Sequence, residues 1–364
     1  MNNNTDKINV RKILIFKLCC FGDIIQLTPA INALYRNYPD AKISIIASSW
    51  IQQLAPFLGH INDIIIFDAP YEKNVLKKIF KTIGIIFRLR KEKFDLCLLG
   101  HRKIIFGLIL KLAGIKFRLG FKGTKYLTHS AEFDPNVHET FRYLKILDSA
   151  NIEYENVPVK LVQLKDKEKI KAENALPTGK LILGIFPFGG SNPGSEMHIK
   201  RWGLENYINL IDRLRNDDRL EIILFEGTLE DEIVNTNNLP PNIIKKKINL
   251  DLLSICDIFM SGDTGPLHIA AAFGANTIAI FGPSDPTLVA PINYPGTEFS
   301  HEYIWLKPEC SPCYTTITAF ETSNTKYWKD KTFICWTGTH KCIEDITVEN
   351  VYQKVTLILN RLKN

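Results

Sequence analysis

A glycine-rich turn is the stretch of this sequence best suited to hold a ligand. Residues 262–265, Gly-Asp-Thr-Gly, follow a short apolar run at 258–260 and precede apolar residues at helical spacing. Asp263 or Thr264 can cap that helix, and Pro266 suits its first turn. Free N–H groups and the positive helix end make such a turn an anion site, best matched to a phosphate or diphosphate. The alternative is an ordinary strand-to-helix loop with a good cap.

Asp23 is a candidate general base. It lies in a glycine-containing loop after the first apolar run, residues 12–18. In open α/β folds such a loop stands at the carboxyl end of the sheet, where ligands bind. A carboxylate there can take the proton of a hydroxyl group that attacks a sugar. Asp23 also suits the cap of a helix expected over 24–37, so the residues alone leave both roles open. The loop lacks GxGxxG, which excludes a dinucleotide fingerprint.

Four cysteines near the carboxyl end have the spacing of a metal site. Cys310 and Cys313 form a Cys-x-x-Cys pair, and Cys335 and Cys342 follow downstream. Four thiolates suit a tetrahedral zinc or iron ion, and His340 is a possible substitute ligand. The role of such an ion would be structural, because it would pin a long loop. The alternative is a cluster of buried thiols without metal.

The elements that must position these residues alternate between strand and helix. Strands are predicted at residues 12–18, 43–47, 64–67, 95–99, 117–120, 181–186, 221–225, 243–248, 258–260 and 277–281. Helices are predicted at residues 24–37, 50–58, 76–91, 104–113, 137–150, 165–174, 204–214, 252–256, 267–273 and 347–362, and from Leu229 onward. This alternation is typical of parallel sheets covered by helices on both faces.

Two such domains fit the length of 364 residues. The first is predicted at 1–165 and the second at 166–346, with a cysteine-rich segment at 307–343 and a terminal helix at 347–364. In the helix at 76–91, the apolar residues are expected to cover the sheet: Leu76, Ile79, Phe80, Ile83 and Phe87. Its basic residues Lys77, Lys78, Lys81 and Arg88 are then expected to face outward.

Composition limits the class of protein. The apolar fraction of 45% and the charged fraction of 23% are those of a globular protein. No uninterrupted apolar run of about twenty residues is present, and the polar N-terminus lacks a signal core, so a cytoplasmic protein is expected. The net charge of +6 is uneven, because residues 73–125 hold fifteen Lys or Arg and two acids. By charge alone this region suits nucleic acid, an anionic membrane surface or a phosphorylated glycolipid.

Two distant stretches resemble glycosyltransferase family 9, the ADP-heptose heptosyltransferases. Residues 263–286, DTGPLHIAAAFGANTIAIFGPSDP, resemble the nucleotide-binding signature of that family. Residues 13–30 resemble its opening strand and Gly-Asp loop, and residues 200–202, Lys-Arg-Trp, resemble its Lys-x-Trp element. The loop at 187–191 departs from the family pattern, because Phe188 separates the proline from the glycine.

The resemblance implies a role for each candidate residue. Asp23 is then the base, and Lys200 meets the donor diphosphate. Glu230 takes the ribose, with Glu226 and Glu232 as rivals. The donor-binding set is Lys200, Glu230, Asp263, Thr264, Gly265 and His268, although a lone histidine in an apolar helix also suits the core. No metal is required for catalysis, because protein cations and helix dipoles can carry the leaving-group charge.

The resemblance also implies a fold and an activity. The fold is α/β, with two Rossmann-like doubly wound domains facing a cleft (GT-B type), and by analogy the last helix packs back on the first domain. The activity is an inverting transfer of heptose from ADP-L-glycero-D-manno-heptose to the lipopolysaccharide inner core. The expected place is the cytoplasm, and nucleic acid is not an expected partner. The basic residues of the helix at 76–91 suit peripheral contact with the anionic inner membrane or with a phosphorylated acceptor.

Three alternatives remain at this point. In the first, the same enzyme modifies a protein such as an autotransporter adhesin, which the cysteine-rich tail favours, because some protein-modifying relatives hold a four-cysteine metal site. In the second, the same fold uses another nucleotide sugar. A non-catalytic binding protein of this fold, stabilised by metal, is the third.

Overall fold

The computed structural model describes residues 9–192, 194–234, 239–241, 243–319 and 321–362. The chain divides into two compact units, Met1–Val157 and Pro158–Asn364. This boundary lies a few residues before the expected one at 165. Leu161 N–H donates to the Ala272 carbonyl at 2.9 Å, which ties the connecting segment to the second unit.

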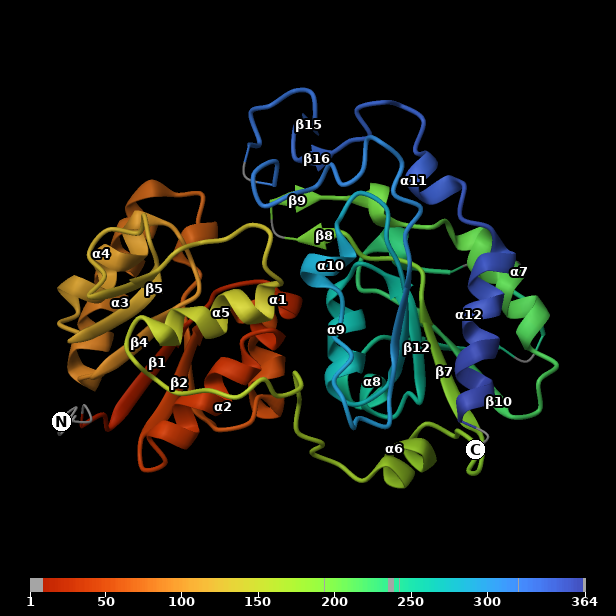
Figure 1. The fold of residues 1–364 in the computed structure, drawn as a ribbon, viewed down its shortest axis with the longest axis horizontal. Helices are drawn as coiled ribbons and strands as arrows, with labels where there is room; N and C mark the ends of the chain where they lie inside the picture. Colours follow the sequence, from red (N-terminus) through yellow and green to blue (C-terminus); the bar gives the residue numbers. More distant parts are fainter. Residues whose placement is uncertain (1–8, 193, 235–238, 242, 320, 363–364) are drawn as a thin grey trace. The chain divides into compact units, whose positions relative to one another are not determined.

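The first unit is built on a parallel sheet of six strands within the described residues, in the order β3-β2-β1-β4-β5-β6 (Figure 1). The strands are β1 (Lys12–Phe16), β2 (Lys42–Ala47), β3 (Ile61–Ile66), β4 (Leu96–Leu99), β5 (Phe117–Phe121) and β6 (His129–Ala131). The central strands β1 and β4 are apolar and buried along nearly their whole length, as parallel strands covered on both faces must be. The strand order reverses at β1 and β4, which is the switch point where open α/β sheets bind ligands.

The helices of this unit are α1 (Phe21–Ile25), α2 (Thr28–Asn37), α3 (Val75–Glu92), α4 (Ile104–Leu112) and α5 (Glu139–Asp148), with 3-10 turns at η1 (Ser49–Phe57) and η2 (Ala69–Tyr71). The single helix expected over 24–37 is therefore two helices. Pro29 lies in the first turn of α2, where its missing N–H costs nothing, but it cannot continue the hydrogen-bond ladder of α1. The helix expected near 50–58 is the 3-10 turn η1, which contains Pro56.

The predicted orientation of α3 is wrong. The residues expected to cover the sheet are exposed: Leu76 by 67%, Ile79 by 49%, Phe80 by 71%, Ile83 by 43% and Phe87 by 66%. Ile85 and Leu89 face the core instead, where they pack with Phe94. The helix thus presents a narrow apolar face to the sheet and a second apolar stripe to solvent.

The second unit repeats the same strand order, β11-β10-β7-β12-β13-β14, among the residues that are described. Its strands are β7 (Leu181–Phe186), β10 (Leu220–Glu226), β11 (Ile244–Lys247), β12 (Ile258–Gly262), β13 (Asn276–Ile280) and β14 (His301–Ile304). Its helices are α6 (Lys167–Glu173), α7 (Leu204–Leu214), α8 (Leu250–Ser254), α9 (Gly265–Ala272), α10 (Pro286–Val289), α11 (Lys341–Glu344) and α12 (Val348–Arg361). All neighbouring strands of this sheet pair in parallel. The doubly wound architecture predicted for both halves is confirmed.

The helix expected from Leu229 differs from the prediction. The structure has a 3-10 turn, η4 (Glu230–Glu232), followed by an extended Ile233. The continuation of the expected helix over 235–238 lies outside the described residues. A second 3-10 turn, η3 (His198–Lys200), precedes α7.

A small sheet joins the cysteine-rich segment to the loop after β7. Its strands β8 (Ser191–Asn192), β9 (Ser195–Glu196), β15 (Trp328–Lys329) and β16 (Thr332–Phe333) have the order β15-β16-β9-β8. Met197, Ile199, Trp328 and Phe333 form a core of their own beneath it. The prediction did not include this sheet, because two-residue strands are too short for apolar alternation to show.

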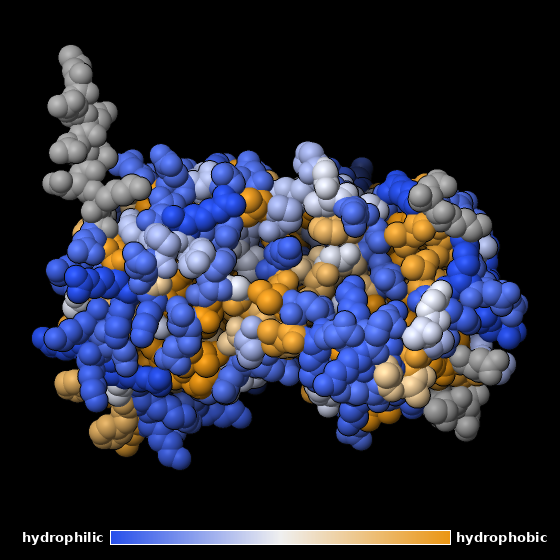
Figure 2. Space-filling model, turned by 90° about the horizontal axis from the view of Figure 1, so that it is seen from below, coloured by the Kyte–Doolittle hydropathy of each residue, from blue (hydrophilic) through white to orange (hydrophobic). Residues whose placement is uncertain are grey.

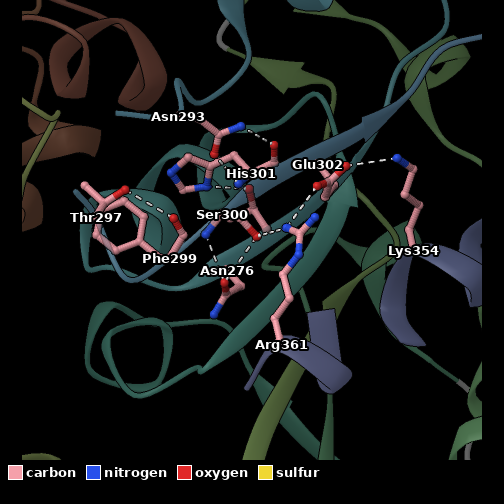
Figure 3. A network of polar contacts seen from close by, with 10 residues as sticks. Asn276, Asn293, Thr297, Phe299, Ser300, His301, Glu302, Lys354 and Arg361 are labelled. Atoms are coloured by element: carbon pink, nitrogen blue, oxygen red, sulfur yellow. Dashed lines mark hydrogen bonds and ion pairs between the residues drawn. The ribbon is translucent and has the colours of Figure 1, made fainter. Parts of the chain in front are cut away.

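The terminal helix α12 packs on α7 and on β13 and β14 of its own unit. Val351, Val355, Ile358 and Leu359 are buried on the apolar face predicted for it. Glu302 on β14 accepts from Lys354 at 2.9 Å and from Arg361 at 3.3 Å, and Arg361 also donates to Ser300 (Figure 3). The expected packing of this helix on the first domain stays a prediction.

The surface is mostly hydrophilic on the face shown in Figure 2, with apolar patches between the polar residues. Of the helices in the described ranges, none combines the length and apolarity needed to cross a membrane.

Candidate active site

In the second unit, a buried ion pair stands at the carboxyl end of β12. Lys200 Nζ lies 2.6 Å from Asp263 Oδ2, and the two side chains are only 9% and 13% exposed. The Ser284 hydroxyl, from the loop after β13, donates to the same oxygen at 2.7 Å. His268 Nε2 lies 4.0 Å from Asp263 Oδ1. The structure therefore brings together three residues of the expected donor-binding set, Lys200, Asp263 and His268.

The pair is charged in spite of its burial. Burial acts to raise the pKa of Asp263, but the charge and hydrogen bond of Lys200, helped by His268 and Ser284, lower that pKa below its usual value. The Lys200 ammonium also lies 4.4 Å from the centre of the Tyr314 ring. An ammonium has three donors, so Lys200 can hold Asp263 and still donate to a further anion. Asp263 thus fixes the ammonium group of Lys200 at a buried site.

The start of α9 adds backbone donors beside this cation. Thr264 occupies the N-cap position but makes no capping hydrogen bond, because its hydroxyl pairs with the Ser261 hydroxyl at 3.0 Å. Pro266 lies in the first turn, as predicted. The N–H groups of the first helical turn and the positive end of the helix dipole together attract an anion. The expectation of a side-chain cap from Thr264 or Asp263 is therefore wrong. The Asp263 carboxylate bonds Lys200 and Ser284 instead.

The loop after β7 approaches the start of α9 so closely that it requires glycine. Gly189 has a φ of +103°, and a Cβ built there would lie 2.5 Å from Thr264 Cγ2. Its N–H donates to Glu232 at 3.3 Å, and its carbonyl accepts from Arg201 Nε at 2.9 Å. Phe188, the departure from the family pattern, is buried next to Phe186. The departure therefore leaves the glycine in place beside the anion site.

The three candidate glutamates have different surroundings. Glu226 is buried, accepting from Val234 N–H at 2.8 Å and pairing with Lys245 at 3.2 Å. Glu232 is also buried and holds Gly189 and Arg201. Glu230 is exposed and makes no hydrogen bond or ion pair to any residue in the described ranges. Of the three, Glu230 alone presents a carboxylate that a ligand can use without breaking an internal contact.

In the first unit, Asp23 stands in the first turn of α1, after β1. Its Oδ2 pairs with Lys17 Nζ at 2.9 Å and accepts from Cys20 N–H at 3.3 Å. Its side chain is 34% exposed, and Oδ1 contacts no donor in the described part of the chain. Asp23 therefore closes the helix start through one oxygen and leaves the other for a substrate. The two roles that the sequence left open are compatible.

A series of buried polar contacts leads from Asp23 through Lys17 into the core of the first unit. Lys17 donates to Tyr143 Oη at 2.9 Å, and Tyr143 donates to Glu139 at 2.6 Å. Burial acts to lower the pKa of Lys17, but the charges of Asp23, Tyr143 and Glu139 raise it well above its ordinary value. Burial, with the Asp23 charge, raises the pKa of Glu139. These charges favour the protonated form of Lys17, and its ammonium group orients Asp23.

Sequence reasoning missed several residues of both sites. Lys17 is in the stretch that resembles the family's opening strand, but nothing marked it as a partner of Asp23. Tyr143 and Glu139 follow more than a hundred positions later, and only an aromatic and an acid one helical turn apart hinted at a polar contact. Ser284 is part of the family-like stretch, and its position after a buried strand is the signal that places it at the same sheet edge.

The four cysteines lie near one another in the second unit. Cys313 N–H donates to the Pro283 carbonyl at 3.0 Å, and a Cβ on Gly282 would lie 3.1 Å from Cys342 Sγ. Burial, followed by the charges of the other cysteines, raises the pKa of Cys313 to about 11 and that of Cys342 to about 12. Across the ranges that the structure describes, however, no group of three or more His, Cys, Asp or Glu is spaced to hold a metal ion. The donor chemistry suits zinc or iron, but the positions of the sulfur atoms do not form a ligand set.

The fold and these sites define the class of protein. Two doubly wound sheets with switch points at their carboxyl edges are the GT-B fold of glycosyltransferases. The structure of ADP-heptose lps heptosyltransferase II from E. coli is 19% identical, covers 97% of this chain and 100% of that chain, and has a TM-score of 0.70. A glycosyl transferase of family 9 from Veillonella parvula is 18% identical, covers 96% and 98%, and has a TM-score of 0.74. At these identities the likeness shows the fold.

The sequence shows the family. The profile of glycosyltransferase family 9 (heptosyltransferase) matches residues 84–322, which is more than half of the chain. The chain belongs to this family and is a glycosyltransferase, as the resemblance implied. It is also similar to lipooligosaccharide heptosyltransferase 2 of Campylobacter jejuni subsp. jejuni, with 25% identity over 97% of this chain and 99% of the relative.

Proposed function

We propose that this glycosyltransferase transfers heptose, with inversion, from ADP-L-glycero-D-manno-heptose to the inner core of lipopolysaccharide. The observation that carries the proposal is the buried Lys200–Asp263 pair beside the uncapped start of α9. A cation and the N–H groups of a helix start at one place suit the diphosphate of a nucleotide sugar. The similarity to lipooligosaccharide heptosyltransferase 2 of Campylobacter jejuni and to ADP-heptose lps heptosyltransferase II of E. coli supports the choice of sugar and acceptor.

The second unit supplies the chemistry of the leaving group. When the bond between the sugar carbon C1 and the phosphate oxygen breaks, negative charge gathers on the leaving ADP. Lys200 and the N–H groups after Thr264 stabilise that charge, and they need little reorganisation because Asp263 holds Lys200 and the N–H groups belong to helix α9. Glu230 accepts hydrogen bonds from the ribose hydroxyls.

The first unit supplies the base. As the acceptor oxygen forms its bond to C1, its proton passes to Asp23 Oδ1, while Lys17 holds Oδ2. The bond to the phosphate breaks on the opposite side of C1, so the configuration at that carbon inverts. The products are the glycosylated acceptor and ADP, and the proton then returns from Asp23 to water.

The test is a donor and acceptor panel with the full chain, read by ADP release. ADP-heptose with heptose-free lipopolysaccharide should give transfer, whereas ADP-glucose or UDP-glucose with the same acceptor should give little. Comparing ADP-heptose with ADP-glucose isolates the sugar, because the nucleotide is the same. Transfer from another nucleotide sugar in preference to ADP-heptose would overturn the donor assignment. Transfer to an adhesin polypeptide but not to lipopolysaccharide would overturn the acceptor.

We propose separately that Cys310, Cys313, Cys335 and Cys342 bind a structural zinc or iron ion. The proposal rests on their spacing in the sequence, on the positions of Cys313 beside Pro283 and of Cys342 beside Gly282, and on the effect of the cysteine charges on one another. Bound metal would draw the sulfur atoms closer than they lie in the structure. Metal analysis of the purified chain should find about one ion, and chelation should lower the melting temperature. The matched control, Cys97→Ser with Cys256→Ser, should retain the metal. A metal-free chain with full activity contradicts the proposal.

A further inference from the structure

The outer face of α3 carries an apolar stripe that the fold does not use. Leu76, Ile79, Phe80, Ile83 and Phe87 follow the spacing of one helical face, and each is between 43% and 71% exposed. Ile85 and Leu89 are at most 5% exposed and lie about half a turn around the helix. The stripe therefore points away from the core of the unit. Burying it is not needed for folding, and leaving it in water carries a cost.

Helix α4 continues this apolar surface. It packs against α3, and the two helices lie side by side in Figure 1. Ile104 is 46% exposed, Ile105 is 48% exposed and Leu112 is 49% exposed. We call the exposed apolar residues of α3 and α4 the α3–α4 face: Leu76, Ile79, Phe80, Ile83, Phe87, Ile104, Ile105 and Leu112. So many large apolar side chains on two adjacent helices exceed the scattered ones that any surface carries.

The side chains of α3 around the α3–α4 face carry mostly positive charge. Helix α3 contains six basic residues and a single acid: Lys77, Lys78, Lys81, Arg88, Arg90 and Lys91, with Glu92 at its last position. That acid is already paired with Lys12 at 3.0 Å, and Lys81 pairs with Glu72 at 2.7 Å. The other basic side chains of α3 have no ion-pair partner in the described ranges. An apolar stripe flanked by cations is the pattern of a helix that lies in the plane of an anionic membrane.

We propose that the α3–α4 face docks the protein on an anionic phospholipid bilayer. The two phenylalanines enter the boundary between headgroups and acyl chains, and the lysine and arginine side chains contact lipid phosphates. Both interactions are needed, because either one alone binds reversibly and weakly. A second copy of the chain is a poorer occupant, since a symmetric contact would bring two sets of these cations together. The inference does not depend on which sugar the enzyme transfers.

The experiment is co-sedimentation of the full chain with lipid vesicles. Vesicles of phosphatidylcholine with about a third phosphatidylglycerol should bind the protein, and pure phosphatidylcholine vesicles should bind it much less. Phe80→Ser with Phe87→Ser should lower the partition coefficient at least about tenfold, because each ring loses a buried apolar surface. Lys77→Glu with Arg88→Glu should lower it on anionic vesicles at least about tenfold, and raised salt should weaken wild-type binding. All four side chains are exposed, so the variants should fold.

Matched controls separate the α3–α4 face from general stickiness. Leu164→Ser with Ile317→Ser removes two exposed apolar residues elsewhere, and Lys329→Glu with Lys331→Glu reverses two exposed lysines elsewhere. Both should bind vesicles as the wild type does. Equal binding by the α3 variants and the wild type overturns the proposal. So does a dimer, seen by analytical ultracentrifugation, that Phe80→Ser with Phe87→Ser dissociates, because the face would then belong to a second copy. ADP release from the donor alone should be unchanged in every variant.

Discussion

Replacing Lys200 with methionine separates the structural role of the buried pair from its chemical role. Without Lys200, Asp263 keeps the Ser284 hydroxyl at 2.7 Å, and His268 Nε2 lies 4.0 Å from its other oxygen, but no Lys or Arg of the described residues then pairs with it. Removing one partner of a buried pair typically costs 3–5 kcal/mol, and the retained hydrogen bond places this case near the lower end, about 3 kcal/mol. For a unit of this size the melting temperature should fall by about 6–12 °C.

The catalytic effect should exceed what this loss of stability explains. A fixed donor aimed at developing charge is worth about 10²–10³ in kcat, so Lys200→Met should lose about that much per folded molecule. The pKa of Asp263 lies below its unfolded value of 3.8, so the pair stabilises the unit above that value. This stabilisation is lost as the pH falls through the lowered pKa. In Lys200→Met the acid-dependent loss should be smaller, as urea titrations at several pH values would show.

A double variant and a control variant distinguish a catalytic role of Lys200 from a purely structural one. Lys200→Met with Asp263→Asn removes the uncompensated charge and should recover part of the stability, yet turnover should stay low. Lys245→Met breaks the pair with Glu226, which lies 3.2 Å away in the same unit, and should lower stability without lowering kcat. If the double variant regains activity together with stability, Lys200 is only structural and the leaving-group role is wrong.

Three further predictions follow from the remaining contacts. Lys17→Met removes the cation that orients Asp23, so kcat should fall about tenfold to a hundredfold while the KM for the donor stays unchanged; a parallel rise in KM would contradict a positioning role. Glu230→Gln should raise the KM for the ADP-sugar about tenfold at constant melting temperature, whereas Glu232→Gln should lower the melting temperature, because Glu232 holds Gly189 and Arg201 inside the unit. Burial lowers the pKa of His301 from 6.5 to about 4, so the unfolded chain holds more protons in that window. The free energy of unfolding should therefore fall by about 3 kcal/mol as the pH drops from about 6.5 to 4. In His301→Gln, urea unfolding should show a smaller dependence of this free energy on pH. An unchanged dependence would mean that other groups cause it.

Much of the fold follows from local pattern. Strand β7 and helix α7 have the predicted bounds, Leu181–Phe186 and Leu204–Leu214, because each is an apolar run or stripe closed by clear breakers. The glycine turn before α9 was predicted at its place for the same reason. These elements need no knowledge of distant partners, since burial on a parallel sheet imposes their composition.

The orientation of α3 shows where pattern fails. Its strongest apolar periodicity is on the outer face, and the inner face needs only Ile85 and Leu89. Periodicity reports that a face avoids water, but it does not say which of two apolar faces meets the core. A membrane surface satisfies the outer stripe as well as a sheet would.

Some residues of the two sites could be predicted from the sequence, and others could not. Asp263 and Thr264 follow directly on β12, and Asp23 lies in the first turn of the helix after β1, so sequence reasoning finds them. The partners Lys17, Tyr143 and Glu139 meet only when β1 and α5 come together, and no local signal records that contact. Glu226 and Glu232 were rivals of Glu230 because a sequence does not show which carboxylate is already occupied inside the fold.

The mechanism proposed above depends most on Asp23, which takes the proton of the attacking hydroxyl. The direct measurement is single-turnover transfer by Asp23→Asn, with ADP binding measured on the same preparation. Asparagine keeps the size of the side chain and an oxygen for the Cys20 N–H, so folding should be retained. The transfer rate should fall by at least about 10², with an unchanged Kd for ADP. Transfer within about tenfold of the wild-type rate would contradict it.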